Sequence, residues 1–547
     1  MTGRRILCAL AGALARLGWR TAAAACLALA SCVPQYPAPS DYVGRRPAQF
    51  PQGTTARTAA PGKPESGPLT LTVEDAILMA LENNHSLAVE RFSPSIRGTY
   101  EDEERAQFDP VLGAGVSAGR VRSERPPTAG SSGGQTTSDT VEGELSLEKY
   151  SPTGTTVMLS GQTDSTNSSV YSDRFASSRV GLTINQALLR GRGLRANLAS
   201  LRQARLDTLS SEYELRGFAL ALVAEVELGY WALALASRQI EIFDESLKLA
   251  RQQLSETRER IMIGKLAEME LAAAQAEVAL RQEDVINARS DLAAARLRLL
   301  RMVNAPGNDF WGRILTLSDQ PEVPDIQLDD VALHVEVAMR LRPDLNQARI
   351  SAQRNELEVV KTRNGLLPKM DLFITLGKSG YADSFGRSVG NIDGQAYDVL
   401  AGLSLRYPLN NRAARARDRR ARLELAQAAE AVRNLEQLAE TDVRVAYIEV
   451  SRAQQQIAAT LATRTLQEEK LRSETEKFRV GKSTSLLVGQ AQRDLTASRI
   501  AEIQAVVNYL RALVTLHRHD GSLLDRRGIA SPGGEPAAIP LFEGNAH

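Results

Sequence analysis

The sequence predicts an α+β membrane protein that joins strands of a β-barrel to very long antiparallel helices, in two copies of one unit. Residues 196–262 contain no Pro and are rich in Ala, Leu, Arg and Glu, which favours one continuous helix. Elsewhere, short alternating segments lie between Gly-, Ser- and Asn-rich loops, a pattern typical of barrel strands. The segment that begins at Ile261 recurs 217 residues later, at Phe478, which indicates a duplication.

The first 31 residues have the pattern of a secretory signal, with four arginines, no acidic residue and the apolar run AAAACLALA. They lead into Leu29-Ala30-Ser31-Cys32, which is similar to the lipobox of bacterial lipoproteins, where a peptidase cuts before a cysteine that carries lipid. Val33 in the next position fits sorting to the outer membrane. An ordinary signal with an incidental cysteine is the alternative.

The composition excludes several function classes. Cys8 and Cys26 lie in the signal, so the mature chain keeps only Cys32 and has no disulfide and no catalytic thiol. Removal of the four signal arginines leaves 66 − 4 = 62 basic residues against 65 acidic ones, a formal charge of −3 that argues against nucleic acid as a partner. His517 and His519 are close in sequence, but they lie near a predicted helix end, and neither a metal nor a cofactor is predicted.

No stretch of 18 apolar residues follows the signal, so no helix is predicted to cross a bilayer, and any crossing requires a closed barrel. Pro, Gly, Ser and Thr dominate the segment after the signal, which cannot build a core, and residues 528–547 also read as loose. The predicted organisation is a signal peptide (1–31), a lipidated linker (32–68), a first repeat (69–310), a second repeat (311–520) and a C-terminal tail (521–547).

The two copies align in three blocks, and the differences in length fall between the blocks, where loops are expected. Because the offset changes from 258 to 221 residues across the strand region, the first copy carries about 37 extra residues there. The matched pairs are Pro110 with Pro368 at an offset of 258, Gly181 with Gly402 at 221, and Tyr230 with Tyr447 and Gly264 with Gly481 at 217.

Each copy ends in a very long helix, a Gly turn and a long helix back. As one helix, residues 196–262 span roughly 100 Å at 1.5 Å per residue. The return helices carry apolar residues at coiled-coil spacing, with small Ala residues between them that let helices approach closely. These residues are Leu271, Val278, Val285, Leu292 and Leu299 in the first copy and Ile500, Ile503, Val507, Leu510 and Val514 in the second.

The strand segments alternate in part and hold many small residues. They are predicted at 111–119, 155–161, 179–185, 370–377 and 398–407. The extra residues of the first copy read as a hairpin around 151–154, which either adds two strands to a barrel or forms a loop outside its wall. The strands alone also fit a soluble β-subdomain; it is their combination with the lipobox and the long helices that favours an outer-membrane barrel.

Over residues 69–520 this order resembles the outer membrane efflux protein family, the TolC-like channels, in its lipoprotein branch. The most specific features are Gly264 and Gly481 at the hairpin turns, Pro110 and Pro368 before the strands, and Arg-Pro-Asp-Leu at 342–345. The resemblance implies a homotrimer whose shared transmembrane barrel, usually of four strands per chain, continues as a helical tunnel across the periplasm of a Gram-negative bacterium. It also implies a periplasmic adaptor and an inner-membrane pump as partners.

Gly481-Lys482-Ser483-Thr484 spells the end of a phosphate-binding loop. The preceding segment reads as a helix instead of a buried strand, so a helical hairpin tip that ends at the glycine is the favoured interpretation. Lys265 and Lys482 then lie beside carbonyl-rich helix ends, where cations are favoured. The resemblance makes the two tips, with Gly264 and Gly481, the docking site for the adaptor.

The family often closes these tips with acidic rings a turn or two after the glycine. Glu270 fits that position in the first copy, whereas Leu487 and Gln490 occupy it in the second. The resemblance therefore implies a gate made of a Glu270 ring and an apolar Leu487 ring, held by pairs of Arg260 with Glu268 or Glu270. A trimeric ring of negatively charged Glu270 side chains would attract cations. Ordinary hairpin packing is the alternative for these residues.

The predicted function is a passive exit duct of a tripartite efflux or type I secretion system, without enzymatic activity. A lipid-anchored coiled-coil scaffold without a pore is the alternative, and a nucleotide-dependent enzyme built on Lys482 is a third hypothesis. The sequence does not identify the exported substrate, because tubes of this kind export many classes of molecule.

Overall fold

The computed structural model describes residues 69–125, 134–168, 174–264, 266–304, 311–324, 328–480 and 482–534, all within the unit 50–547. The signal peptide, Cys32, the linker, Lys265 and Gly481 lie outside the described residues.

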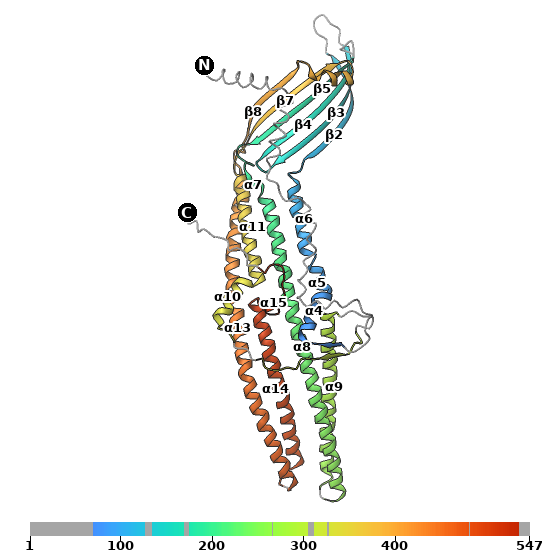
Figure 1. Cartoon of the computed structure of the whole chain (residues 1–547), viewed down its shortest axis with the longest axis vertical. Helices are drawn as coiled ribbons and strands as arrows, with labels where there is room; N and C mark the ends of the chain where they lie inside the picture. The colour runs from blue at the N-terminus through green and yellow to red at the C-terminus, as the bar shows by residue number, and fades with distance from the viewer. Residues whose placement is uncertain are drawn as a thin grey trace. The chain divides into compact units, whose positions relative to one another are not determined.

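Two very long helices dominate the described part of the chain (Figure 1). α8 (Ala199–Met262) has 64 residues and α13 (Arg412–Arg479) has 68, so each runs for about 100 Å at 1.5 Å per residue. Neither contains Pro, and both are rich in Ala, Leu, Arg and Glu, the residues that lose least on entering a helix. The prediction of one continuous helix over 196–262 is therefore confirmed to within three residues.

Each long helix packs against a return helix of 35 residues, α9 (Met269–Val303) on α8 and α14 (Ser485–His519) on α13. The predicted heptad positions lie on the packed faces, because Val285, Leu299 and Val507 are all nearly inaccessible to solvent. α8 and α9 approach so closely at Gly229 that a Cβ there would lie 2.5 Å from the Met302 methyl group.

α8 contains an 18-residue window that is long and apolar enough to cross a membrane, with a mean hydropathy of 1.6. Of that window, 61% is buried inside the structure, as in the core helix of a soluble bundle. α8 packs against α9, α14 and α11 (Pro343–Gly365), which accounts for the apolar composition.

Short elements join the two halves of the chain beside α8. β1 (Leu69–Leu71) pairs in parallel with β6 (Leu315–Leu317), and the Tyr230 hydroxyl of α8 donates to the Leu71 carbonyl at 3.0 Å. The remaining helices are α4 (Val73–Asn83), α5 (His85–Glu90), α6 (Ser93–Ala106), α7 (Leu194–Asn197), α10 (Val331–Leu341), α12 (Phe385–Gly390) and α15 (Leu523–Arg526), with a 3-10 turn η1 (Asn391–Asp393).

The other described strands form one antiparallel six-stranded sheet in the order β2-β3-β4-β5-β7-β8, which curves at one end of the helices (Figure 1). The strands are β2 (Val111–Arg125), β3 (Gly134–Ser151), β4 (Thr155–Ser168), β5 (Phe175–Ala187), β7 (Lys369–Ala382) and β8 (Tyr397–Arg406). Every predicted strand is present. The extra hairpin, β3 with β4, lies inside the sheet, so it adds two strands to the four that the family resemblance implied.

The chain after α14 is more ordered than the sequence indicated. Residues 528–547 were expected to be loose, yet Ile529 is buried and the segment up to residue 534 is described. Arg216 of α8 anchors this segment, because its guanidinium donates to Asp525 and to Ser531, both at 2.9 Å. The division of the chain into two repeats stays a prediction.

Candidate functional site

The sheet has one apolar and one polar face. Because side chains alternate along a strand, the register assigns each residue to a face. One face carries Leu112, Val116, Leu145, Leu147, Val157, Leu159, Leu182, Ile184, Leu372, Ile374, Leu376, Val399, Leu403 and Leu405. Several of these side chains are widely exposed, up to 85% at Val116. An apolar face of this extent, with several widely exposed side chains, is what a lipid-facing barrel wall requires.

The apolar band stops before the strands end. Toward the loop after β2, the same face carries Arg120 and Asp139, whose side chains pair with Nε 2.5 Å from Oδ1. On β7 and β8 it carries Lys378 and Tyr397 in register. Charged and aromatic residues at the edge of an apolar band are typical of the boundary between lipid and water.

The opposite face is polar and is cross-linked by side chains. Arg179 of β5 reaches across β7 to Asp398 of β8, with Nη2 2.6 Å from Oδ2. Gly377 lies between the two, and a Cβ there would come within 2.3 Å of the Asp398 carboxylate. Ser177 donates to Asp164 on the same face. A polar face opposite the apolar one suits the wall of a water-filled lumen.

The first hairpin tip follows α8. Gly264 adopts the left-handed conformation, with φ +72°, and its N–H donates to the Ile261 carbonyl at 2.9 Å. This conformation ends a helix and favours glycine, because any side chain would crowd the following carbonyl. The prediction that the helix stops here is confirmed.

Gly264→Ala is expected to destabilise the protein by about 1–2 kcal/mol, the cost of a left-handed alanine. Gly489→Ala is the matched control, because Gly489 lies inside α14 and its added Cβ would only contact Arg493 at 3.9 Å. That substitution should raise stability by about 0.5–1 kcal/mol. Thermal unfolding in detergent measures both, and shifts of the same sign would contradict the assignment of the tip.

The second tip follows α13 and contains the GKST stretch. The Lys482 N–H donates to the Lys477 carbonyl at 2.8 Å, as in a Schellman helix end, and the Thr484 hydroxyl accepts from the Leu487 N–H at 3.4 Å as the N-cap of α14. A helix of 68 residues precedes the stretch where a phosphate loop needs a strand. The described residues of the stretch, Lys482, Ser483 and Thr484, therefore connect two helices.

The two hairpins are tied to each other near their tips. Ser485 of α14 donates to the Glu270 carboxylate of α9, and about two turns further on Arg493 donates to Glu277 at 2.7 Å. Between the hairpins lies a groove of about 370 Å³. Its lining includes Gln252, Thr257, Arg260, Phe478 and Gln492.

The predicted gate residues fall on both sides of these ties. Glu268 and Gln490 are exposed, Leu487 is 46% exposed, and Glu270 is half-buried. Arg260 differs from expectation: within the described part of the chain it forms no ion pair with Glu268 or Glu270. Its guanidinium lies 4.9 Å from the centre of the Phe478 ring, because α13 presents this ring across the groove.

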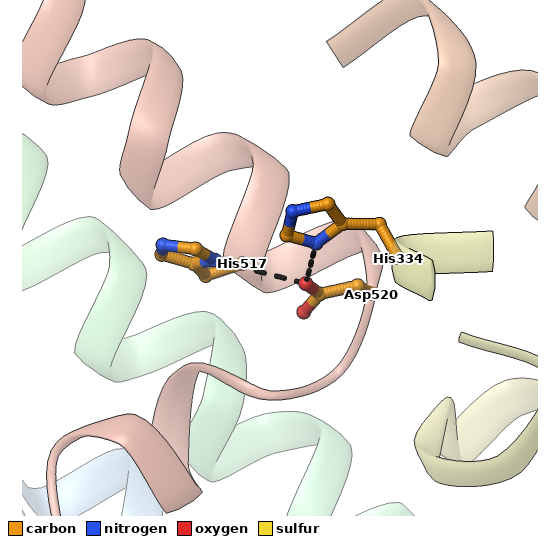
Figure 2. A group of neighbouring side chains, drawn as sticks. All are labelled: His334, His517 and Asp520. Carbon is orange, nitrogen blue, oxygen red and sulfur yellow. Dashed lines mark hydrogen bonds and ion pairs between the residues drawn. The ribbon is translucent and has the colours of Figure 1, made fainter. Parts of the chain in front are cut away.

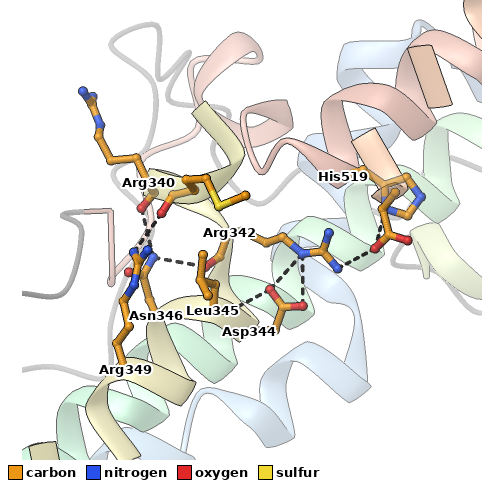
Figure 3. Close-up of polar contacts among 9 residues, drawn as sticks. Arg340, Arg342, Asp344, Leu345, Asn346, Arg349 and His519 are labelled. Atoms are coloured by element: carbon orange, nitrogen blue, oxygen red, sulfur yellow. Dashed lines mark hydrogen bonds and ion pairs between the residues drawn. The ribbon is translucent and has the colours of Figure 1, made fainter. Parts of the chain in front are cut away.

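The Arg-Pro-Asp-Leu stretch is a structural joint between α10 and α11 (Figure 3). Pro343 opens α11, and Leu345 is fully buried. Arg342 pairs with Asp344 at 3.0 Å and with Asp442 of α13 at 2.8 Å. These contacts hold α10 and α11 against α13.

A cluster that the sequence analysis missed lies where α14 ends. His334, His517 and Asp520 converge there (Figure 2), although the sequence drew attention only to His517 and His519. His519 points elsewhere, with its Nδ1 3.9 Å from Asp442. No local signal links His334 to Asp520, which are 186 residues apart.

A family model described as outer membrane efflux protein matches residues 154–305 and 335–522. This is more than half of the chain, so the chain belongs to the outer membrane efflux protein family. The family is one of efflux channels and not of enzymes. The function of this chain is accordingly that of an outer-membrane exit duct, with a barrel continued by a helical tunnel.

Solved structures share the fold. The Campylobacter jejuni CmeC outer membrane channel is 14% identical, with a TM-score of 0.61 over 86% of this chain and 87% of CmeC. The Vibrio cholerae outer membrane protein VceC is 17% identical, with a TM-score of 0.59 over 82% and 96%. The Neisseria gonorrhoeae MtrE channel, solved in its open state, is 18% identical, with a TM-score of 0.57 over 83% and 89%. No curated protein sequence matches significantly.

Proposed function

We propose that three copies of this chain assemble into one passive duct across the outer membrane and the periplasm. The observation that carries the proposal is the two-faced sheet with two open edges. No described strand pairs with the outer edge of β2 or of β8, and such edges are normally covered. With six alternating strands per chain, β8 of one copy runs antiparallel to β2 of the next, so identical contacts close a ring.

Three copies of six strands give a barrel of eighteen. Barrels of about 16–18 strands leave an aqueous channel, whereas about eight strands are filled by their own side chains. The polar face with Arg179 and Asp398 lines this channel, and the apolar face with Leu159 contacts lipid. A barrel wider than the twelve strands implied by the family resemblance follows from the inserted β3–β4 hairpin.

The helices offer a matching contact surface. Leu438, Val445 and Ile448 of α13 lie within one stripe of the helix and are 47%, 60% and 66% exposed. In a soluble helix such a stripe is normally covered by protein. The neighbouring copy covers it in the proposed trimer, so that the α8–α9 and α13–α14 hairpins of three chains enclose the periplasmic tunnel.

The hairpin tips form the end of the tunnel that connects to the pump. The tips with Gly264, Lys265, Gly481 and Lys482 dock a periplasmic adaptor, which links the duct to an inner-membrane pump. The duct itself performs no catalysis, so the pump supplies the energy and selects the substrate. Lipid on Cys32 anchors each chain in the outer membrane.

The duct is closed at the tips until the adaptor engages them. Glu270 and Leu487, flanked by Glu268 and Gln490, narrow the opening, and the Glu270–Ser485 and Glu277–Arg493 ties hold the two hairpins of each chain together. Breaking such ties lets the hairpins separate. The open state described for MtrE supports the existence of open and closed arrangements in this fold.

Planar-bilayer conductance of the detergent-purified trimer tests the proposal. The double variant Glu270→Ala, Leu487→Ala is expected to show larger and more frequent openings than the wild type. A loss of about 1.4 kcal/mol of closing free energy raises the ratio of open to closed channels about tenfold. The matched control is Glu259→Ala, Leu486→Ala, which changes one exposed acid and one exposed leucine beside the tips.

Three outcomes separate the hypotheses. Large openings in the Glu270 and Leu487 variant alone support a gate at the tips. Equally large openings in all three proteins would support the duct but would show that the gate is not formed by Glu270 and Leu487. Absence of conductance from folded, trimeric protein would favour the lipid-anchored scaffold without a pore.

A further inference from the structure

Three side chains able to bind a metal converge at the junction of α10, the end of α14 and the turn before α15 (Figure 2). His334 comes from α10, His517 from the last turn of α14, and Asp520 is the residue that ends α14. Each offers one ligand atom, and all three atoms lie within 4.8 Å of one another. The cluster lies far from the hairpin tips: along α14, Ser485 at the tip lies 32 residues from His517, about 48 Å at 1.5 Å per residue.

The geometry of the cluster is close to that of a metal centre. His334 Nδ1 lies 2.8 Å from Asp520 Oδ2, and His517 Nδ1 lies 3.6 Å from the same oxygen. In a tetrahedral zinc site with bonds of about 2.0–2.1 Å, neighbouring ligand atoms are about 3.3–3.4 Å apart. The His334 separation is shorter than that spacing and the His517 separation is longer. Small side-chain rotations would therefore bring the ligand atoms to the spacing of a zinc site.

Asp520 is held in position to act as a ligand. Its second oxygen, Oδ1, accepts the Ser522 N–H at 2.8 Å, which leaves Oδ2 facing the two imidazoles. The turn between these residues is fixed by Gly521, at φ +76°, where a Cβ would lie 3.1 Å from the Leu341 backbone. Outer contacts that orient a ligand in this way are a regular feature of metal sites.

The charge of the cluster calls for a cation. Asp520 is fully buried at the carbonyl end of α14, where the helix dipole disfavours an anion. Within the described residues, no Lys or Arg forms an ion pair with this carboxylate. A buried carboxylate without a positive partner is costly.

Both imidazole rings turn their Nδ1 atom toward the Asp520 carboxylate. Nδ1 of His517 is shielded from solvent and makes no hydrogen bond, although it faces Asp520. His334 is 2% exposed, so its Nδ1, which lies 2.8 Å from Asp520 Oδ2, also faces the cluster away from solvent. A buried nitrogen atom without a hydrogen-bond partner is rare in proteins, and a bound ion is one of the arrangements that account for it.

We propose that His334, His517 and Asp520 bind one divalent transition-metal ion of the Zn²⁺ class. Two neutral imidazoles and one carboxylate form a donor set that zinc accepts, with a fourth position open to water. The ion replaces the proton between His334 and Asp520 and supplies the missing positive charge. It ties α10 to the end of α14 in apolar surroundings that include Ala338, Tyr447 and Leu516.

Zinc binding to the mature full-length protein, purified in detergent without a histidine tag and stripped with a chelator, tests this site. Equilibrium dialysis against Zn²⁺ followed by elemental analysis should find one ion per chain in the wild type and none in His334→Gln or Asp520→Asn. X-ray absorption should show nitrogen and oxygen ligands. The matched control is His519→Gln, two residues from His517, which should bind as the wild type does.

A second measurement keeps the test independent of misfolded variants. Zn²⁺ should raise the Tm of the wild type and of His519→Gln by several degrees, and a chelator should reverse the rise. A wild-type protein that binds less than one ion per three chains, or whose Tm does not respond to zinc, overturns the proposal and leaves a buried histidine–aspartate pair. Equal loss of zinc in His519→Gln also overturns it, because the ion then lies elsewhere.

Discussion

Leu159→Arg is expected to reduce stable insertion of the protein into the outer membrane, whereas Ser160→Arg leaves insertion intact. Leu159 is 48% exposed near the middle of the apolar face, between Leu147 and Leu182 on the neighbouring strands. An arginine at the bilayer midplane of a barrel costs about 2–4 kcal/mol on the lipid side. Three copies multiply this cost, so the effect is the largest that one surface substitution should produce here.

Ser160 is the matched control because it is the next residue on the same strand and belongs to the opposite face. There an arginine lies near Glu144 and Glu148 of β3 and faces water in the lumen. The amount of protein in isolated outer membranes, and its Tm after extraction in detergent, measure both variants. Equal losses for the two substitutions, or a greater loss for Ser160→Arg, would show that the apolar face is not the lipid face.

Local sequence patterns were sufficient to predict the helices and the tips. A stretch without Pro fixed the extent of α8 because nothing else interrupts a helix of good formers, and Gly264 marked its end because a left-handed residue is needed there. The strands were also found, but the predicted ranges for β2, β4, β5 and β7 were short by several residues, whereas the range for β8 had the right length. β2 contains Gly113, Gly115 and Gly119, which weaken the alternation of apolar and polar residues by which a strand is predicted.

Contacts between distant segments could not be predicted in the same way. His517 and His519 attracted attention as a pair, but residues two apart on a helix point in different directions, so they cannot share a ligand. The true neighbours of His517 are Asp520, beyond the end of the helix, and His334, which tertiary packing brings from α10. For the same reason the contact of Arg260 with Phe478 could not be predicted, since Phe478 comes from the other hairpin. The pairing of Arg260 with an acidic residue at the gate stays a prediction.

The second large prediction concerns the ion pair between Glu227 of α8 and Arg527, which follows α15. Glu227 lies in the middle of α8 with no exposure to solvent, and both of its oxygens accept from Arg527, at 2.8 and 2.7 Å. Arg527→Ala leaves this carboxylate buried and unpaired, and removal of one partner of a buried ion pair costs about 3–5 kcal/mol. We therefore expect a marked fall in Tm and release of the segment after α14.

Arg526→Ala is the control, because its partner Asp329 lies 3.6 Å away and both side chains are about half exposed. Such a surface pair is worth about 0–1 kcal/mol. Thermal unfolding of the trimer in detergent compares the two variants, and limited proteolysis reports release of the segment. Small and equal decreases in Tm for Arg527→Ala and Arg526→Ala would show that water reaches Glu227.

A third variant separates the ion pair from simple loss of packing. The double substitution Glu227→Gln, Arg527→Ala removes the buried charge together with its partner, so it should be more stable than Arg527→Ala alone. The stability that the double substitution recovers measures the penalty of the unpaired carboxylate. The loss of stability that remains measures the contacts of the Arg527 stem with α8. Without any recovery, the role of Arg527 is packing, and the segment after α14 is held mainly by Leu523, Leu524 and Ile529, which are buried.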